Sequence, residues 1–226
     1  MNTFIFSATA GKKEDSMLYN TCKDEGIDIF IKEHNKESLQ KTYNKAIDFA
    51  IKERVENLVL VHDDVILEAF SERRIERNFE KFDIVGVAGC NKVTLKKPVL
   101  WHLLGGGFEG GHLIGAVAHG TEGQKHMGGF GFYPNRAILI DGVFLVIKRK
   151  VFEKIRFDES CPSKWHFYDL DYSMQCHKAG FKVGVGDFIV THKSPGLTEF
   201  TEEFQKGEDW FLDKWKSKEQ KEGKNI

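Results

Sequence analysis

The 226-residue chain has the length of one substantial domain, and its 41% apolar content suffices for a packed core, which excludes an intrinsically disordered protein. Its 33 basic and 34 acidic residues nearly cancel, so we expect no nucleic-acid partner. Four cysteines without C-x-x-C spacing exclude a zinc knuckle and a disulfide framework, and they fit a reduced, cytoplasmic setting.

Alternating strands and helices are predicted over the N-terminal part of the chain. Short β-rich runs are separated by longer mixed segments, which is typical of βαβ units on a mostly parallel sheet. These runs are residues 3–7, 27–32, 57–62 and 82–88. Residues 58–61 are apolar at every position, which predicts a central strand covered on both faces.

A helix is expected between the second and third of these strands. Apolar residues recur there at helical spacing, as expected of a helix packed on a sheet: Leu39, Tyr43, Ala46, Ile47, Ala50 and Ile51. Ser38 precedes this stripe and is a candidate for its N-cap or first turn.

Hydrophobic runs that could anchor the chain are missing from the sequence. The first apolar segment is too short for a signal peptide, and no run approaches the roughly 18 apolar residues of a membrane-spanning helix. We therefore expect no transmembrane segment, while peripheral contact with a membrane stays open.

Glycine dominates residues 105–131. This segment holds 11 of the chain's 22 glycines, together with His112, His119 and His126. A stretch so poor in side chains is not expected to be part of the core. Two interpretations stay open, a disordered insert and a lid that closes over a ligand.

Regular elements resume in the C-terminal part. We expect an apolar run at 137–147, interrupted at Asp141 and Gly142, a short amphipathic segment at 149–155, a helix at 167–179 ending at Gly180, a strand at 181–190 and a helix at 199–215. The lysine-rich residues 216–226 are expected to form a solvated, frayed tail. The predicted organisation is one domain, 1–215, followed by this tail.

Carboxylates and imidazoles follow two of the predicted strands. His62, Asp63 and Asp64 come after the buried run, and His192 follows the strand at 181–190. Open α/β folds bind ligands at the carboxyl ends of their strands, and a divalent cation stabilises neighbouring carboxylates. Such a mixed site suits manganese or magnesium. The alternatives are a turn that caps the next element for the aspartates and a structural role for His192.

Two aspartates, Asp169 and Asp171, lie at the start of the helix at 167–179, beside a cluster of aromatic residues. A favourable interaction with the helix dipole accounts for at least one of them. Aromatic faces stack on sugar rings, and a nearby carboxylate can take a proton from a sugar hydroxyl. The sequence lacks the P-loop of nucleoside triphosphatases, and no G-x-G-x-x-G of dinucleotide-binding proteins follows the first strand. It also lacks the G-x-S-x-G of serine hydrolases. These three functions are therefore poor fits.

These motifs, in this order, resemble a family of prokaryotic and viral glycosyltransferase-like proteins, related to the large inverting group that includes cellulose and hyaluronan synthases. The resemblance spans residues 3–215 and depends on the segments 38–44, 61–65, 83–89, 141–144, 157–159, 166–172 and 192–194. It implies an α/β fold with a single GT-A type, nucleotide-sugar-binding domain, in which helices flank a mostly parallel mixed central sheet.

The resemblance also implies a chemistry. Members move a sugar from a nucleoside diphosphate sugar, here a UDP- or GDP-sugar, to a hydroxyl of a glycan acceptor, with Mn²⁺ or Mg²⁺ as cofactor and inversion at the anomeric carbon. Extension of a surface glycan or capsule polysaccharide follows as the expected role. Two alternatives stay open, a sugar nucleotidyltransferase and a catalytically inactive carbohydrate-binding protein.

By position, the resemblance implies roles for single residues. Asp169 corresponds to the catalytic base, whereas Asp171 is structural. Asp64, Asp63 and His192 correspond to metal ligands of a D-x-D-type site. The remaining candidates are Ser7, Asn44, His62 and Asp63 for the nucleotide, and Trp101, Asp141, Gly142, His166 and Tyr168 for the substrate.

Overall fold

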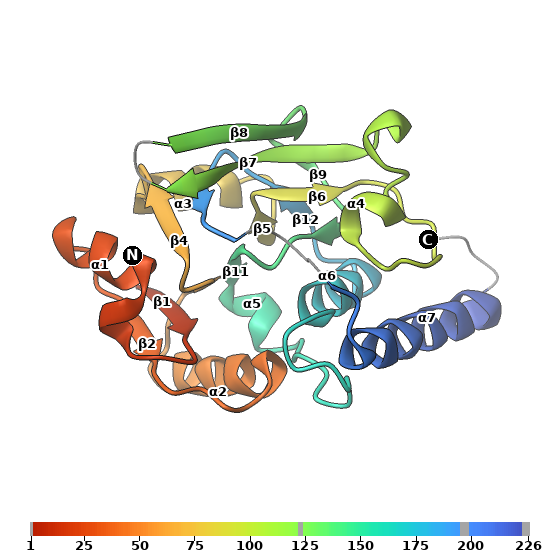
Figure 1. The fold of residues 1–226 in the computed structure, drawn as a ribbon, viewed down its shortest axis with the longest axis horizontal. Helices are drawn as coiled ribbons and strands as arrows, with labels where there is room; N and C mark the ends of the chain where they lie inside the picture. The colour runs from red at the N-terminus through yellow and green to blue at the C-terminus, as the bar shows by residue number, and fades with distance from the viewer. Residues whose placement is uncertain (1, 122–123, 195–198, 223–226) are drawn as a thin grey trace.

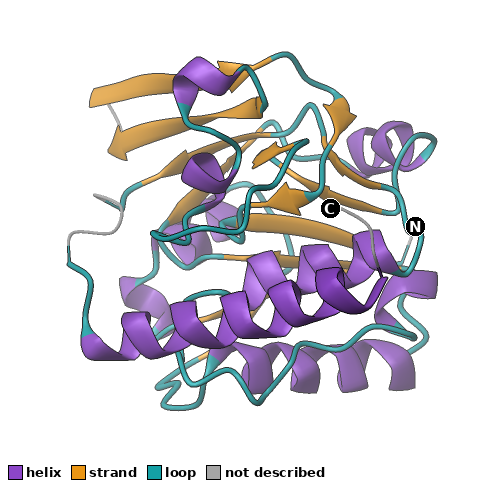
Figure 2. Cartoon of the chain, turned by 90° about the vertical axis from the view of Figure 1, so that its right-hand side faces the viewer, coloured by secondary structure: helices purple, strands orange, loops and turns teal. Residues whose placement is uncertain are grey.

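The computed structural model describes residues 2–121, 124–194 and 199–222. In these parts of the chain, two β-sheets and the surrounding helices form a layered structure (Figure 1). Figure 2 shows the longer helices gathered on one side of the strands. The predicted α/β class is therefore confirmed.

The first sheet is the mostly parallel mixed sheet that the sequence predicted. Its strand order is β2-β1-β3-β11-β5-β12-β9. The strands are β1 Thr3–Ala8, β2 Phe30–Lys32, β3 Asn57–Val61, β5 Ile84–Gly86, β9 Asn135–Arg136, β11 Phe144–Lys148 and β12 Val183–Val185. The pairings make five of them run in one direction, with β11 and β9 opposed.

A second sheet, which the sequence did not predict, has the order β10-β6-β7-β13-β4, with β8 paired to β7. Its strands are β4 Val65–Glu68, β6 Ala88–Cys90, β7 Leu113–Thr121, β8 Gln124–Gly131, β10 Leu139–Ile140 and β13 Ile189–His192. All of its pairs are antiparallel except β7 with β13.

The chain passes between the two sheets at six short connections, of which residues 132–134 and 137–138 flank β9 and the other four concern the candidate site or the predicted strands. These four are residues 62–64, 87, 141–143 and 186–188, each of which joins a strand of one sheet to a strand of the other. The runs predicted as single strands at 82–88 and 181–190 are therefore two strands each, because an apolar pattern continues through a change of sheet. The candidate residues at 62–64 and 141–142 lie in these connections.

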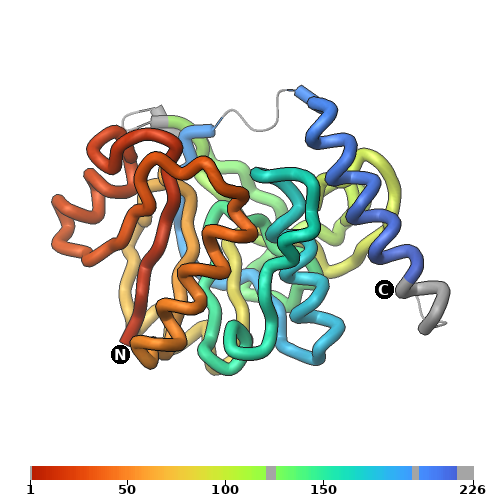
Figure 3. The backbone as a smooth tube through the Cα atoms, turned by 90° about the horizontal axis from the view of Figure 1, so that it is seen from below, coloured from red at the N-terminus to blue at the C-terminus, as the bar shows by residue number. Residues whose placement is uncertain are grey.

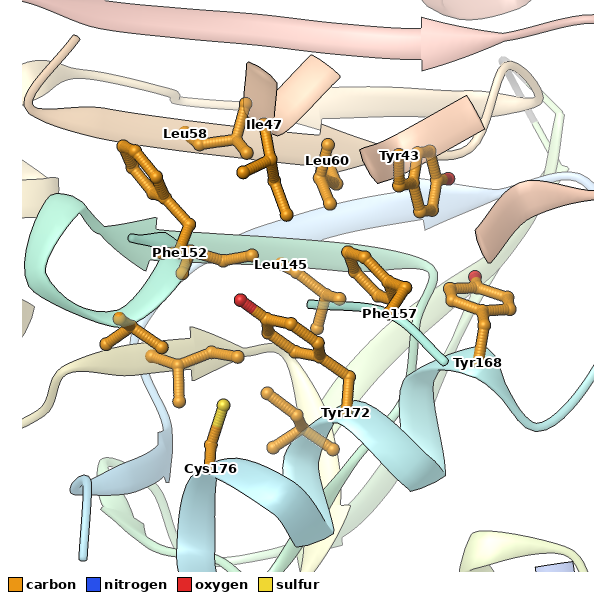
Figure 4. Close-up of a cluster of buried hydrophobic side chains, with 14 of the residues drawn as sticks. Tyr43, Ile47, Leu58, Leu60, Leu145, Phe152, Phe157, Tyr168, Tyr172 and Cys176 are labelled. Carbon is orange, nitrogen blue, oxygen red and sulfur yellow. The ribbon is translucent and has the colours of Figure 1, made fainter. Parts of the chain in front are cut away.

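Both faces of β3 are covered, as its continuous apolar run predicted. All five of its residues are buried. Leu58 and Leu60 belong to a core cluster with Tyr43 and Ile47 (Figure 4). Val59 and Val61 belong to a second cluster on the other face, which includes side chains of α1, α3 and the second sheet. The sheet thus forms the centre of the molecule.

The helices are η1 Lys13–Asp15, α1 Met17–Asp24, α2 Leu39–Lys52, α3 Glu72–Phe79, α4 Trp101–Leu104, η2 Phe108–Gly110, α5 Arg149–Phe152, α6 Tyr168–Lys178 and α7 Glu202–Glu222. The predicted cap of α2 is confirmed, since the hydroxyl of Ser38 accepts a hydrogen bond from the Lys41 N–H. Gly180, just beyond α6, has φ +82°, the left-handed conformation that ends many helices.

Helix α7 is longer than the sequence predicted. It continues to Glu222, through most of the segment expected to be a frayed tail, while residues 223–226 lie outside the described chain. Its apolar side chains Phe211 and Trp215 are buried in a third cluster with Leu170 and Met174 of α6. Figure 3 shows α7 lying alongside α6. Packing against α6 therefore stabilises this helix as far as Trp215, and the Lys, Glu and Gln residues beyond it are good helix formers that continue it.

Strands β7 and β8 make up most of the described glycine-rich segment, so the interpretation as a disordered insert is wrong there, whereas closure over a ligand stays a prediction. Strand β7 pairs with β6 and β13 on one edge and with β8 on the other, and residues 113–118 are buried. A Cβ atom would lie 2.1 Å from the Val87 carbonyl oxygen at Gly115 and 2.2 Å from the Leu113 carbonyl oxygen at Gly131. These glycines allow strands to approach closely, so they indicate tight packing and not mobility.

The four cysteines are buried free thiols, as the absence of a disulfide pattern predicted. Within the described residues, none of the helices combines the length and apolar character that crossing a membrane requires.

Candidate active site

A cavity of about 1060 Å³ lies beside the connections between the two sheets. Its walls include residues of the 62–64 and 141–143 connections, the first turn of α6, the β7–β8 hairpin and the start of α7. This volume is at the upper end for small-molecule sites. The cavity is therefore large enough for a ligand with several chemical groups.

Two imidazoles and one carboxylate meet at one end of this cavity. Each of His62, Asp64 and His192 offers one ligand atom, and these atoms lie within 4.8 Å of one another. His192 Nε2 is 3.2 Å from an oxygen of Asp64. The two residues are close because His192 of β13 pairs with Val65, the first residue of β4. The backbone strengthens this arrangement, because the Lys193 N–H donates to the Asp64 carbonyl. The group has the donor chemistry of a transition-metal site.

The protonation of this group suits cation binding. Burial and the neighbouring His192 lower the pKa of His62, which favours its neutral form with a free lone pair. Burial raises the pKa of the Asp64 carboxyl, but the hydrogen bond and charge of His192 outweigh it, so this pKa lies below its ordinary value. Both side chains are thus in the form in which they ligate metals.

Tyr168 links this group to α6. Its hydroxyl oxygen is 2.7 Å from His62 Nε2. A histidine that ligates a metal commonly uses its other nitrogen in such a hydrogen bond, which fixes the ring. Burial raises the pKa of the Tyr168 phenol well above its ordinary value, so the phenol keeps its proton. Tyr168 therefore orients His62.

Asp169 follows Tyr168 and lines the same cavity. Its Oδ2 accepts a hydrogen bond of 2.8 Å from the Gly142 N–H. Burial, and then the charge of Asp141, raise the pKa of Asp169 to about 7. Gly142 has no side chain because a Cβ there would lie 2.2 Å from the Tyr168 hydroxyl oxygen. A carboxylate with this pKa can accept a proton near neutral pH.

Asp141 is held in the 141–143 connection. Its Oδ2 accepts a hydrogen bond of 2.8 Å from Trp101 Nε1, and its Oδ1 accepts one of 2.9 Å from the Val143 N–H. Trp101 in turn contacts the Phe130 ring edge-on at 5.1 Å. Asp141 and Trp101, two predicted substrate residues, thus form one fixed wall of the cavity.

Aromatic side chains form the wall near α7. His166, a predicted substrate residue, lines the cavity and contacts Phe204 with ring centroids 5.2 Å apart. Trp165 also lines the cavity and is 41% exposed, which leaves part of its ring available to a ligand. This wall offers the stacking surfaces that sugar rings use.

Three predicted site residues lie apart from the groups described so far. The Asn44 side chain bonds to the backbone of Phe157 and to the carboxylate of Glu159, and it does not line the cavity. Ser7 is fully buried in β1 and does not line it either. Asp63 lines the cavity but is outside the group of three ligands, where His62 takes its place.

Asp171 has no part in the cavity lining. Its carboxylate accepts hydrogen bonds from Lys214 Nζ and from Trp215 Nε1 of α7, the latter at 3.0 Å. The side chain is buried. It therefore fixes α7 to α6, the structural role expected from the resemblance.

Sequence reasoning missed three histidines near the site, of which His102 lines the cavity and the other two lie on the β7–β8 hairpin. His119 lines the cavity, and its ring centroid is 5.7 Å from that of His126 and 6.3 Å from that of His192. A strand-like pattern did point to His119, because Val117 and His119 are two residues apart, the spacing at which side chains of a strand lie on one face. The surrounding glycines concealed it, because they indicated a loop.

A comparison with models of protein families identifies the family of the chain. The model of the Glycosyltransferase like family matches residues 17–218, and the chain belongs to this family. None of the curated proteins compared with the chain matches it significantly.

Solved structures add a comparison of the fold. The chain is similar to the crystal structure of A197 from STIV, with 16% sequence identity, 86% of each chain covered and a TM-score of 0.54. It also aligns with a glycosyltransferase involved in the glycosylation of the major capsid of PBCV-1, at 12% identity over 95% of this chain and 100% of that one, with a TM-score of 0.38.

A third alignment is with the inositol-1-phosphate CTP transferase from T. maritima, at 17% identity, 92% and 78% coverage and a TM-score of 0.37. The first of these likenesses shows a shared fold, and the other two are too loose to carry an argument.

Proposed function

We propose that this protein is a metal-dependent, inverting glycosyltransferase that moves a sugar from a nucleoside diphosphate sugar to a hydroxyl of a glycan acceptor. The observation that carries this proposal is the pairing, in one cavity, of a carboxylate whose pKa is about 7 with a group of two imidazoles and a carboxylate. Membership of the Glycosyltransferase like family supports it.

The residues present fit a divalent cation. His62, Asp64 and His192 would hold it, because their ligand atoms already lie within 4.8 Å of one another. Two imidazoles favour Mn²⁺ over Mg²⁺, which prefers oxygen ligands and keeps several waters. A bound cation would offset the negative charge that develops on the diphosphate leaving group.

Asp169 is the proposed general base. Direct displacement with inversion requires a base that removes the proton of the acceptor hydroxyl as the new bond to the anomeric carbon forms. A carboxylate with an ordinary pKa is a poor base, whereas one with a pKa of about 7 is basic enough and still substantially ionised at neutral pH. The Gly142 N–H fixes its orientation.

Aromatic side chains are the proposed acceptor contacts. Trp165 and His166 line the same cavity as Asp169, so a sugar stacked on them would lie in the cavity that contains this carboxylate. We propose that the acceptor is a glycan, with a surface polysaccharide as the resulting product.

The two rival functions make different demands on the cavity. A sugar nucleotidyltransferase handles a triphosphate, and the described cavity lining contains neither lysine nor arginine to bind one. An inactive carbohydrate-binding protein has no need for a carboxylate with a raised pKa. Neither rival is favoured by a specific contact.

The test is calorimetry with UDP, GDP, CTP and dTTP, each with and without Mn²⁺. We expect Mn²⁺-dependent binding of one nucleoside diphosphate. Asp64→Ala should abolish this dependence, whereas the neighbouring Asp63→Ala should retain it, since Asp63 is outside the ligand group. Preference for a triphosphate, or binding that ignores both Mn²⁺ and Asp64→Ala, would overturn the proposal.

A further inference from the structure

Three histidines lie directly opposite one another on neighbouring strands of the second sheet. His192 of β13 pairs with His119 of β7, and His119 pairs with His126 of β8. Partners in register project to the same face of a sheet. Their rings contact in series, with centroids 6.3 Å and 5.7 Å apart. We call His192, His119 and His126 the histidine row.

The row begins at the proposed cation group and ends at the surface. His192 is one of the three cation ligands, and His62 contacts its ring at 5.6 Å. His119 is partly buried and lines the cavity, while His126 is exposed and lies outside the lining, next to the His119 ring. The imidazoles therefore extend from the cation group along the β7–β8 hairpin.

Glycine keeps this side of the hairpin open. Gly128 lies two residues from His126 on the same face of β8, opposite Val117. A Cβ atom at Gly128 would lie 3.5 Å from Cδ2 of His119. A side chain there would contact the His119 ring, so glycine leaves this part of the ring uncovered.

The charges of the cavity make these imidazoles important for an anionic ligand. The described residues that line it include five carboxylates, those of Asp63, Asp64, Asp141, Asp169 and Glu199, and neither lysine nor arginine. A diphosphate that enters such a cavity needs hydrogen-bond donors beyond the cation. A neutral imidazole always carries one N–H donor, so it meets this need without a fixed charge.

We infer that His119 and His126 donate hydrogen bonds to the diphosphate of the sugar donor, next to the cation held by His62, Asp64 and His192. The row thus takes the place of the basic side chains that commonly bind phosphate groups. This inference depends on the proposed function for the identity of the ligand. Its chemistry requires only a diphosphate group.

Inorganic pyrophosphate with saturating Mn²⁺ is the probe, because it carries the diphosphate without a base or sugar. We expect His119→Phe, which keeps a ring of similar size and removes the N–H, to weaken pyrophosphate binding about tenfold or more. His119→Gln, which retains an N–H donor, should recover part of the loss. The control is His177→Asn on α6, since His177 neither lines the cavity nor belongs to the histidine row.

Affinity for Mn²⁺ alone, measured by electron paramagnetic resonance, separates the two possible roles of His119. It should stay within about twofold of the wild-type value in His119→Phe and fall in His192→Phe. Unchanged pyrophosphate binding in His119→Phe would overturn the inference, and so would a loss of Mn²⁺ binding that accounts for the loss of pyrophosphate.

His126→Phe keeps the inference testable if substitution at His119 prevents folding. This residue is exposed, so we expect a smaller loss of pyrophosphate affinity, about threefold. Unchanged pyrophosphate affinity in this variant would show that His126 does not bind the diphosphate. Pyrophosphate binding that behaves as expected, in a protein that binds no nucleoside diphosphate, would instead refute the proposed function and leave the row intact.

Discussion

The first turn of α6 holds two aspartates with different partners, although burial raises the pKa of both carboxyls. On the cavity side, Asp169 is held by a backbone N–H beside the charge of Asp141, and its pKa rises to about 7. On the α7 side, Asp171 is bonded to Lys214 and Trp215. The comparison teaches that two aspartates, two residues apart in one helix, can have different surroundings. On this difference we base the proposed roles of Asp169 in chemistry and of Asp171 in stability.

The largest expected effect separates the two regions by turnover. Asp169→Asn keeps the shape of the side chain and its hydrogen bond from Gly142 but removes the base, so turnover at saturating donor should fall at least about a hundredfold. Calorimetry should show donor binding within about twofold of the wild type. Asp171→Asn is the matched control and should retain transfer if it folds. An active Asp169→Asn beside a folded but inactive Asp171→Asn would reverse the two roles.

The free energy of unfolding should show how much the contacts of Asp171 with α7 stabilise the protein. Asp171→Ala leaves the largely buried ammonium of Lys214 with Asp158 as its remaining acidic partner and deprives the Trp215 N–H of its acceptor. We expect a loss of about 3 kcal/mol in the free energy of unfolding, measured in urea. Asp158→Ala removes the more exposed partner of the same lysine and should cost less than about 1.5 kcal/mol. Equal losses in the two variants would contradict this account.

The pH dependence sharpens the comparison from the cavity side. The pKa of Asp169 is about 7 in the folded protein and about 3.9 in an unfolded chain, so folding is progressively penalised as pH rises from about 4 to 7. Asp169→Asn removes this penalty. Its free energy of unfolding relative to the wild type should therefore increase between pH 5.5 and 8 by about 2 kcal/mol.

Ionisation of the Asp169 carboxyl lowers stability as the pH rises, but it should increase catalytic activity. The kcat/KM of the wild type should rise with pH and level off above about 7, because only the ionised Asp169 accepts a proton. A difference in unfolding free energy that does not change with pH, together with a flat kcat/KM profile below 7, would show that Asp169 is an ordinary exposed carboxylate.

The smallest expected effect tests how closely the 141–143 connection fits α6. A Cβ at position 142 would lie 2.2 Å from the Tyr168 hydroxyl oxygen and 2.8 Å from Asp169 Cβ. Gly142→Ala should displace this turn, lowering turnover about tenfold and stability by about 1 kcal/mol. Gly129→Ala is the control, because a Cβ there meets nothing within 4 Å. Equal turnover in the two variants would show that the close fit has no catalytic role.

The sequence by itself determined the α/β class, the buried strand β3, the helix α2 with its Ser38 cap and the helix α6 with two acidic residues in its first turn. These features depend on local periodicity, capping and burial, which neighbouring residues encode. The order of the motifs along the chain also indicated the family that the comparison confirms.

Only the tertiary structure decided how the apolar runs divide between two sheets, why His62 joins Asp64 and His192 while Asp63 does not, and how three histidines far apart in the sequence come into register. It also separated the environments of Asp169 and Asp171, which look alike in sequence. The physical reason is that strand register, burial and the charges surrounding a side chain arise from contacts between distant segments, and local patterns carry no information about them.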